Sequence, residues 1–153
     1  LLDYILYQVD KPSVLLKDEI HHLEDYIALE EMRFSDTLEV NFKKENINES
    51  LQVAPMLLIP FLENSFKHGK IVDGKINVDL FLRNEKDSLH FKIENSSEKI
   101  EDNTVGIGLT NIRKRLKMLY PNQYQLEIEQ SSKLFKVDLK LDLNQTKNEN
   151  HVK

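Results

Sequence analysis

The chain of 153 residues contains no cysteine, only four glycines, no surplus of positive charge and no long apolar run. Without cysteine there are no disulfides, thiolate metal sites or cysteine nucleophiles. No run approaches the roughly 18 apolar residues of a membrane-spanning helix, and no signal-peptide pattern is present, so we expect the fragment not to be membrane-inserted. The net charge of −5 argues against nucleic acid as a partner, because phosphate binding needs a face rich in Lys and Arg.

What the chain does contain is typical of one soluble globular domain. Hydrophobic residues make up 40% and charged residues 31% of the sequence, and the length is sufficient to enclose a core. The apolar spacing of residues 1–6 is that of the end of a helical face, so we expect the chain to begin inside a larger protein. The few permissive backbone positions lie between residues 69 and 108: Gly69, Gly74, Gly106 and Gly108.

Hydrophobic periodicity predicts the secondary structure. Helical spacing predicts helices from residue 16 to about 34, from Pro60 to a left-handed stop at Gly69, and from after Gly108 to Pro121. Alternating apolar residues predict strands over 38–42, 76–82, 89–93, 126–128 and 137–143, with a turn at 84–87. Because hairpins dominate this order, we predict an α+β two-layer sandwich, in which a mixed, mostly antiparallel sheet carries helices on one face.

The end of the second predicted helix carries residues that suit phosphate chemistry. Asn64, Lys67 and His68 are three and four residues apart and therefore project from one helix face. An amide oxygen can ligate Mg²⁺, an ammonium group can neutralise phosphate, and an imidazole N–H can donate to it. A solvated helix face before a glycine would have the same spacing.

A second candidate segment runs from Gly106 to Asn111, where a loop leads into the third predicted helix. Free backbone N–H groups in that setting can hold an anion. The segment is not the dinucleotide-binding fingerprint, because the third glycine is absent, and it is not a P-loop, because no Gly-Lys-Ser/Thr follows. A turn followed by a helix start gives the same sequence.

Taken together and in this order, residues 55–69 and 106–116 resemble the N-box and the glycine-rich box of the LytS-type sensor histidine kinases. Upstream, residues 15–19 and 26–34 resemble the segment that joins the dimerisation helices of that family to its ATP-binding domain. The likeness covers residues 1–143. It implies an ATP-binding domain with the Bergerat-type fold shared by gyrase, heat-shock chaperones, histidine kinases and mismatch-repair proteins.

The resemblance assigns roles to individual residues. It implies that Asn64 ligates the Mg²⁺ that bridges the phosphates of ATP, and that Lys67 and His68 contact phosphate oxygens; Asn64 and Lys67 are the implied catalytic residues. The implied nucleotide-binding stretch of the glycine box is Gly106, Ile107, Gly108 and Leu109, where the glycines let the backbone approach the triphosphate. Residues 96–105 would form a short lid.

Three positions depart from the pattern of that superfamily. Asn95 stands where an Asp usually accepts a hydrogen bond from the adenine amino group, and the loss of charge would weaken adenine selectivity by roughly 1 kcal/mol. Phe135 stands near the place of a Gly-Thr pair that helps to form the adenine site. Pro60 stands where the hydrolytic members carry a water-activating Glu, so we expect no efficient ATP hydrolysis.

The resemblance also implies an activity and partners. Residues 1–35 would be the end of the dimerisation region and a linker helix, residues 36–143 the catalytic domain, and residues 144–153 a disordered tail. The γ-phosphoryl group would pass from Mg·ATP to a His outside this chain and then to the receiver domain of a response regulator. No acceptor motif is present, since His21 and His22 lack its context, so we expect the fragment to be inactive alone.

We expect the full-length protein to be a homodimer and this chain to be the cytoplasmic domain of a membrane-anchored bacterial kinase. Two other interpretations stay open. The changes at Asn95 and Phe135 would also suit a degenerate nucleotide-binding domain, or a non-enzymatic module that scaffolds or regulates a partner. A phosphate-free interaction domain could share the fold. Arg115 has two interpretations: it either lies in a solvated basic turn or contacts the phosphates.

Overall fold

The computed structural model describes residues 12–97, 104–131 and 133–144. Its elements in chain order are β1 (Val14–Leu15), α2 (Leu16–Phe34), η1 (Ser35–Thr37), β2 (Leu38–Glu45), β3 (Gln52–Val53), α3 (Ile59–His68), β4 (Ile76–Glu85), β5 (Ser88–Ser96), α4 (Thr104–Leu119), β6 (Tyr124–Gln130) and β7 (Leu134–Asp142). None of the helices among these residues is long and apolar enough to cross a membrane.

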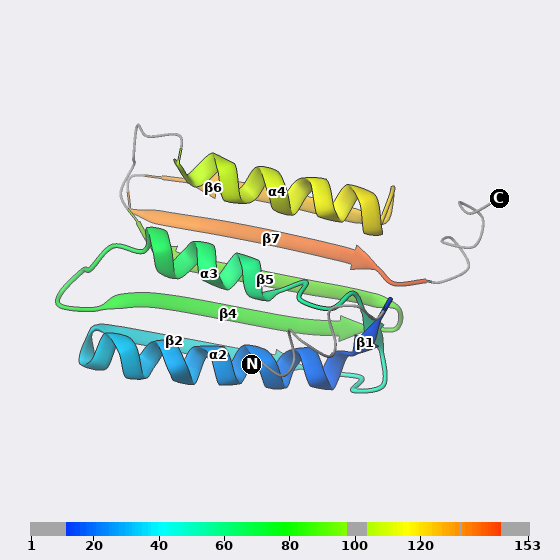
Figure 1. Ribbon diagram of the computed structural model, residues 1–153, viewed down its shortest axis with the longest axis horizontal. Helices are drawn as coiled ribbons and strands as arrows, with labels where there is room; N and C mark the ends of the chain where they lie inside the picture. Colours follow the sequence, from blue (N-terminus) through cyan, green and yellow to red (C-terminus); the bar gives the residue numbers. More distant parts are fainter. Residues whose placement is uncertain (1–11, 98–103, 132, 145–153) are drawn as a thin grey trace.

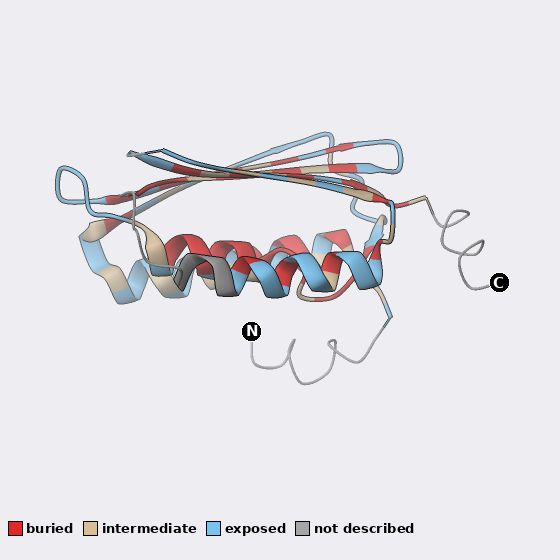
Figure 2. Ribbon diagram, turned by 90° about the horizontal axis from the view of Figure 1, so that it is seen from above, coloured by how far each residue is buried: buried red, intermediate tan, exposed pale blue. Residues whose placement is uncertain are grey.

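The molecule has two layers, a sheet and a row of helices (Figures 1 and 2). The five-stranded sheet has the order β2-β4-β5-β7-β6. The pair β2 and β4 is parallel, because the chain crosses over through α3 between them, and the other three pairs are antiparallel. All three helices cover the same face of the sheet, with α3 between α2 and α4. The predicted α+β architecture is confirmed.

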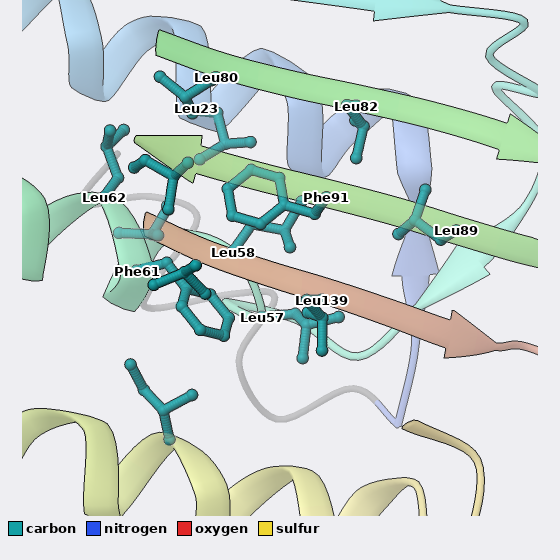
Figure 3. Close-up of a cluster of buried hydrophobic side chains, with 14 of the residues drawn as sticks. Leu23, Leu57, Leu58, Phe61, Leu62, Leu80, Leu82, Leu89, Phe91 and Leu139 are labelled. Carbon is teal, nitrogen blue, oxygen red and sulfur yellow. The ribbon is translucent and has the colours of Figure 1, made fainter. Parts of the chain in front are cut away.

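The core lies between the layers and follows the alternation of the strands. Every second residue of β4 and β5 points at the helices, and Leu82, Phe91 and Ile93 are fully buried there. From the helical side, the Phe61 ring of α3 lies 5.8 Å from the Phe91 ring between centroids, and Figure 3 shows the leucines around this pair. The core thus fixes α3 against the middle of the sheet.

Helix α2 belongs to the same core. Leu16 and Leu23 have no exposed surface, and the Tyr26 ring stacks on the Phe66 ring of α3 with 5.7 Å between centroids. Burial, followed by the nearby carboxylates of Glu30 and Glu63, raises the pKa of Tyr26. The tyrosine therefore stays neutral and serves as a packing surface between α2 and α3.

The predicted reason for Gly69 at the end of α3 is wrong. Its φ is −65° and its ψ is 141°, which is extended rather than left-handed. A Cβ at this position would lie 2.7 Å from Ile76 Cγ2 and 2.9 Å from the Ser65 carbonyl oxygen. Glycine is needed because β4 approaches the end of the helix closely, whereas Gly74, with φ of 81°, is the expected turn residue.

Two other boundaries differ from the sequence prediction. Helix α4 begins at Thr104, so Gly106 and Gly108 are helical rather than ahead of the helix. Each glycine costs a helix about 1 kcal/mol relative to alanine, and the buried face of α4 compensates for this. The β4–β5 hairpin continues to Glu85, which leaves a two-residue turn in place of the predicted 84–87. The short pair β1 and β3 was not predicted, because two residues carry no periodicity.

Candidate functional site

A cavity of about 310 Å³ lies between α3 and α4, lined from two helical faces. Helix α3 contributes Pro60, Glu63, Asn64, Lys67 and His68, and α4 contributes Gly108, Asn111, Ile112 and Arg115. Both sets follow the three-and-four spacing of one side of a helix. The volume is at the lower end of the roughly 300–1,000 Å³ usual for ligand sites. The structure thus brings Asn64, Lys67 and His68 together with Gly108 at one cavity.

Asn64 is the buried polar residue of this cavity. Its side chain is 8% exposed, and its Nδ2 has no hydrogen-bond partner in the described part of the chain. A Cβ added to Gly108 would lie 3.3 Å from Asn64 Oδ1, so only glycine leaves that side of the amide open. Leaving a buried polar atom unpaired costs about 1–3 kcal/mol, which a ligand that binds the amide would recover.

The last turn of α3 brings Lys67 and His68 to the cavity, beside Glu63 and Arg115. Lys67 is exposed and His68 is half-buried. Burial, and then the nearby Lys67, lowers the pKa of His68 from its ordinary value of 6.5. Near pH 7 this turn therefore presents an ammonium group and a neutral imidazole, which can donate a hydrogen bond to an anion without an additional charge.

Asn95 lies on the helix-covered face of the sheet, at the end of β5, and it does not line this cavity. It is 1% exposed, and its Nδ2 donates to the Ser96 carbonyl oxygen over 3.0 Å. Its Oδ1 has no partner among the described residues and remains a buried acceptor. Phe135, 2% exposed, is its direct neighbour on β7, so two of the three positions that depart from the superfamily pattern lie side by side.

The four residues of the predicted glycine box lie in different surroundings. Gly106 and Ile107 lie in the first turns of α4, and Gly108 is exposed in the cavity wall. Leu109 is 7% exposed and packs in the hydrophobic core, so its side chain does not line the cavity. Of the predicted lid, 96–105, Ser96 belongs to β5 and residues 104 and 105 to α4, and residues 98–103 lie outside the described ranges.

Sequence reasoning did not single out Glu63 and Asn111 as site residues. Each is exposed in the cavity wall, and counting three or four residues from Asn64 and Gly108 along each helix would have found the lining positions. Arg115, for which two interpretations stayed open, donates from Nη1 to the Met56 carbonyl oxygen over 2.5 Å and from Nη2 to that of Pro55. Its guanidinium group therefore binds backbone in this structure.

Larger hollows lie elsewhere, and two of them show a different character. One of about 410 Å³ lies beside the β4–β5 turn, and one of about 670 Å³ opens on the strands. The first mixes Arg83 and Lys140 with Glu85 and Asp142, and neither includes the unpaired amide of Asn64. Within the described ranges, no group of three or more His, Cys, Asp or Glu could hold a metal ion by itself.

No protein-family model matches the chain. The sensor histidine kinase BtsS of Escherichia coli K12 is 30% identical over 125 residues, which are 77% of this chain and 22% of BtsS. The sensor protein kinase HptS of Staphylococcus aureus USA300 is 24% identical over 101 residues, 66% of this chain and 18% of HptS. The chain thus spans about a fifth of the length of these curated relatives.

Solved structures share the fold at low identity. The catalytic domain of histidine kinase ThkA has a TM-score of 0.61 at 14% identity, over 86% of this chain and 94% of that domain. Histidine kinase AdeS of Acinetobacter baumannii has a TM-score of 0.64 at 12% identity, over 94% and 73% of the two chains. The fold is that of histidine kinase catalytic domains. With the sequence match to BtsS, the chain belongs to the sensor histidine kinases, as their catalytic, ATP-binding domain.

Proposed function

We propose that the cavity between α3 and α4 binds Mg·ATP and presents its γ-phosphate for transfer to a His that lies outside this chain. The observation that carries the proposal is the placement of Asn64, Lys67 and His68 around one cavity, facing Gly108 on the neighbouring helix. The function follows from positioning and charge neutralisation, which supply most of the catalysis in phosphoryl transfer.

Asn64 would hold Mg²⁺ through its amide oxygen. Because the described residues contain no acidic cluster for a metal, the remaining ligands would be phosphate oxygens and water, as is usual for Mg²⁺ in nucleotide sites. When bound, the ion would neutralise charge on the transferring phosphoryl group. The amide oxygen Oδ1, on the side of Gly108, fits this role, and the unpaired Nδ2 would donate to a phosphate oxygen.

Lys67, His68 and the start of α4 would bind the phosphates. Lys67 supplies a positive charge, and neutral His68 supplies an N–H donor. The N–H groups of a helix's first turn have no partner within that helix, and the first turn of α4 includes Gly106. Together with the positive end of the helix dipole, these N–H groups favour a bound anion.

Asn95 would accept a hydrogen bond from the adenine amino group through Oδ1. Its amide Nδ2 already donates to the Ser96 carbonyl, which leaves Oδ1 as the free side of a fully buried side chain. A neutral acceptor forms a weaker hydrogen bond than the usual carboxylate. We therefore expect ATP to bind with adenine recognised, but less tightly than with Asp at this position.

Hydrolysis would be slow, because Pro60 lines the cavity where a water-activating carboxylate stands in hydrolytic relatives of the fold. Glu63 is the carboxylate that does line the cavity, and it is exposed. If the chain does turn over ATP in water, Glu63→Gln identifies whether that carboxylate is responsible.

The partners follow from the same assignment. Histidine kinase ThkA has been solved in complex with the response regulator protein TrrA, and we propose a response-regulator receiver domain as the partner of the protein to which this chain belongs. We further propose that residues 1–35 lead in from a dimerisation region, that residues 36–143 form the catalytic domain and 144–153 a tail, and that the whole protein is a membrane-anchored homodimer with this domain in the cytoplasm.

A second candidate function is a degenerate domain that regulates a partner without phosphoryl transfer. The observation in its favour is Phe135, a large buried side chain directly beside Asn95 where relatives of the fold often carry small residues. If this ring fills the adenine site, the phosphate half of the cavity would remain and the affinity for ATP would be lost.

Thermal unfolding of the chain with and without Mg·ATP tests the proposal. A ligand at a hundred times its Kd stabilises a protein by about 2.7 kcal/mol, which gives a clear rise in Tm. Asn64→Ala should abolish the part of the rise that requires Mg²⁺, while Asn77→Ala, an exposed amide on β4, should keep it. No rise at millimolar Mg·ATP would leave the degenerate domain as the better account.

A further inference from the structure

Residues 54–58, which lead from β3 into α3, are held by side chains from both neighbouring helices. From α2, Glu19 reaches this segment; Arg115 of α4 reaches it too, as does Tyr120, which directly follows α4. The Tyr120 hydroxyl accepts the Ala54 N–H over 2.8 Å. The segment sets where α3 begins, and α3 carries Asn64 one turn and a half further on.

Glu19 is a carboxylate with no exposed surface, 37 residues away from the first group that it binds. Its Oε2 accepts the Met56 N–H and its Oε1 accepts the Leu58 N–H, each over 3.3 Å. Leu58 is the N-cap of α3 and cannot cap the helix with its own side chain. Glu19 therefore supplies both a cap and a negative charge at the N-terminus of α3 from a different helix.

Arg115 binds the same segment from the opposite side, through the carbonyl oxygens of Met56 and Pro55. Met56 has a φ of 57°, a left-handed conformation that a side chain of its kind adopts only when its surroundings impose it. Its N–H is held by a negative side chain from α2 and its C=O by a positive side chain from α4. The two helices α2 and α4 therefore meet at Met56, where together they position the start of α3.

We propose that Glu19 and Arg115 are positioning residues for nucleotide binding: they hold residues 55–58 so that Asn64 on α3 faces Gly108 on α4. The inference rests on the proposed function of the cavity. Glu19 does not line the cavity, so its effect on a ligand has to pass through α3. It also makes α2 part of the support of the proposed metal-binding amide.

The test uses the full chain and measures the Kd for ATP twice, once with Mg²⁺ and once with EDTA. The ratio of the two values reports the contribution of the metal and hence the placement of Asn64. Glu19→Gln keeps one acceptor oxygen and Glu19→Ala keeps none. We expect the Mg²⁺-dependent tightening to fall about fivefold for Gln and about tenfold or more for Ala, with binding in EDTA little changed.

Leu23→Ala is the matched control, because Leu23 is a fully buried residue of the same helix with no polar contact to residues 54–58. The substitution should lower Tm but leave the hydrogen bonds of Glu19 and Arg115 in place. The ratio of the Kd for ATP in EDTA to that with Mg²⁺ should therefore equal that of the unsubstituted chain. If Glu19→Ala does not fold, Glu19→Gln tests the claim alone, because Glu19 lies outside the cavity whereas Arg115 lines it; Arg115→Lys, which keeps the charge but loses the paired hydrogen bonds to two carbonyls, then serves as a second test.

The outcomes separate the two claims. If the unsubstituted chain fails to bind Mg·ATP, the proposed function fails and the inference falls with it. If the unsubstituted chain binds, and the folded Glu19 and Arg115 variants keep its Mg²⁺ ratio, the proposed function stands and the positioning role is overturned. A loss of the ratio equal to that in Leu23→Ala would also overturn it, because destabilisation alone would then explain the effect.

Discussion

Replacing Gly108 with alanine should stabilise the domain and weaken its binding of Mg·ATP. Gly108 is a helical residue of α4, so alanine removes a conformational cost of about 1 kcal/mol. The new Cβ would lie 3.3 Å from Asn64 Oδ1, where ordinary contacts are 3.4–4 Å. The amide has to move by a few tenths of an ångström, which returns part of the gain. We expect the free energy of unfolding to rise by up to about 1 kcal/mol.

The effect on the ligand has the opposite sign. A misplacement of 1 Å at a reacting centre can lower the reaction rate about a hundredfold. The amide would move by only a few tenths of an ångström, but alanine would also add a methyl group to the cavity wall. We therefore expect the Kd for Mg·ATP to rise about tenfold. Urea unfolding measures the stability and isothermal titration calorimetry the Kd. In EDTA, where Asn64 has no metal to bind, the substitution should reduce the affinity for ATP less.

Gly69→Ala is the matched comparison. Its Cβ would lie 2.7 Å from Ile76 Cγ2 and 2.9 Å from a backbone oxygen, so overpacking should lower the free energy of unfolding by about 1–3 kcal/mol. The affinity of the folded protein for Mg·ATP should change little. The reasoning is refuted if Gly108→Ala binds Mg·ATP as tightly as the unsubstituted chain, or if both glycine variants lose stability and affinity in parallel.

Three further predictions concern other parts of the site. The pKa of His68 is lowered in the folded state, so the unfolded chain binds the proton more readily. The contribution of His68 to the free energy of unfolding is therefore complete above about pH 6.5 and is lost as the pH falls below that value. Between pH 7.5 and 5.5, urea unfolding should show a smaller fall in the free energy of unfolding for His68→Gln than for the unsubstituted chain. An equal fall in both would contradict this. Tyr120→Phe leaves the buried Ala54 N–H unpaired and should cost about 1–3 kcal/mol in chemical denaturation; a change near zero would show that the N–H finds another acceptor. Asn95→Asp should tighten ATP but not GTP by about 1 kcal/mol in calorimetry, because adenine carries an amino donor at C6 where guanine carries a carbonyl oxygen; equal changes for both nucleotides would remove Asn95 from the adenine site.

The parts of the fold that depend on local pattern were predictable from the sequence. Helix α2 ends at Phe34 and α3 begins beside Pro60, as their apolar spacing and the proline indicate. The hairpins of β4–β5 and β6–β7 follow from alternation. The face of α3 that carries Asn64 and Lys67 could also be read from three-and-four spacing, since that geometry is a property of the helix itself.

What could not be predicted depends on contacts between distant residues. Gly69 is required by the approach of Ile76 rather than by its own φ, and nothing local distinguishes the two reasons. Glu19 has the spacing of a first-turn carboxylate on α2, yet it is fully buried and binds the start of α3. The start of α4 was placed too late, because two glycines argue against helix locally while the buried face of the helix supports it.

The central claim is that Mg·ATP binds between α3 and α4, and amide chemical-shift mapping tests it most directly. Titrating the ¹⁵N-labelled chain with Mg·ATP should move the amide signals of Asn64, Lys67, His68 and Gly108, with smaller changes at Asn95. The signals of the β4–β5 turn beside the 410 Å³ hollow should stay in place. Changes confined to that turn, or no change at millimolar Mg·ATP, would contradict the account.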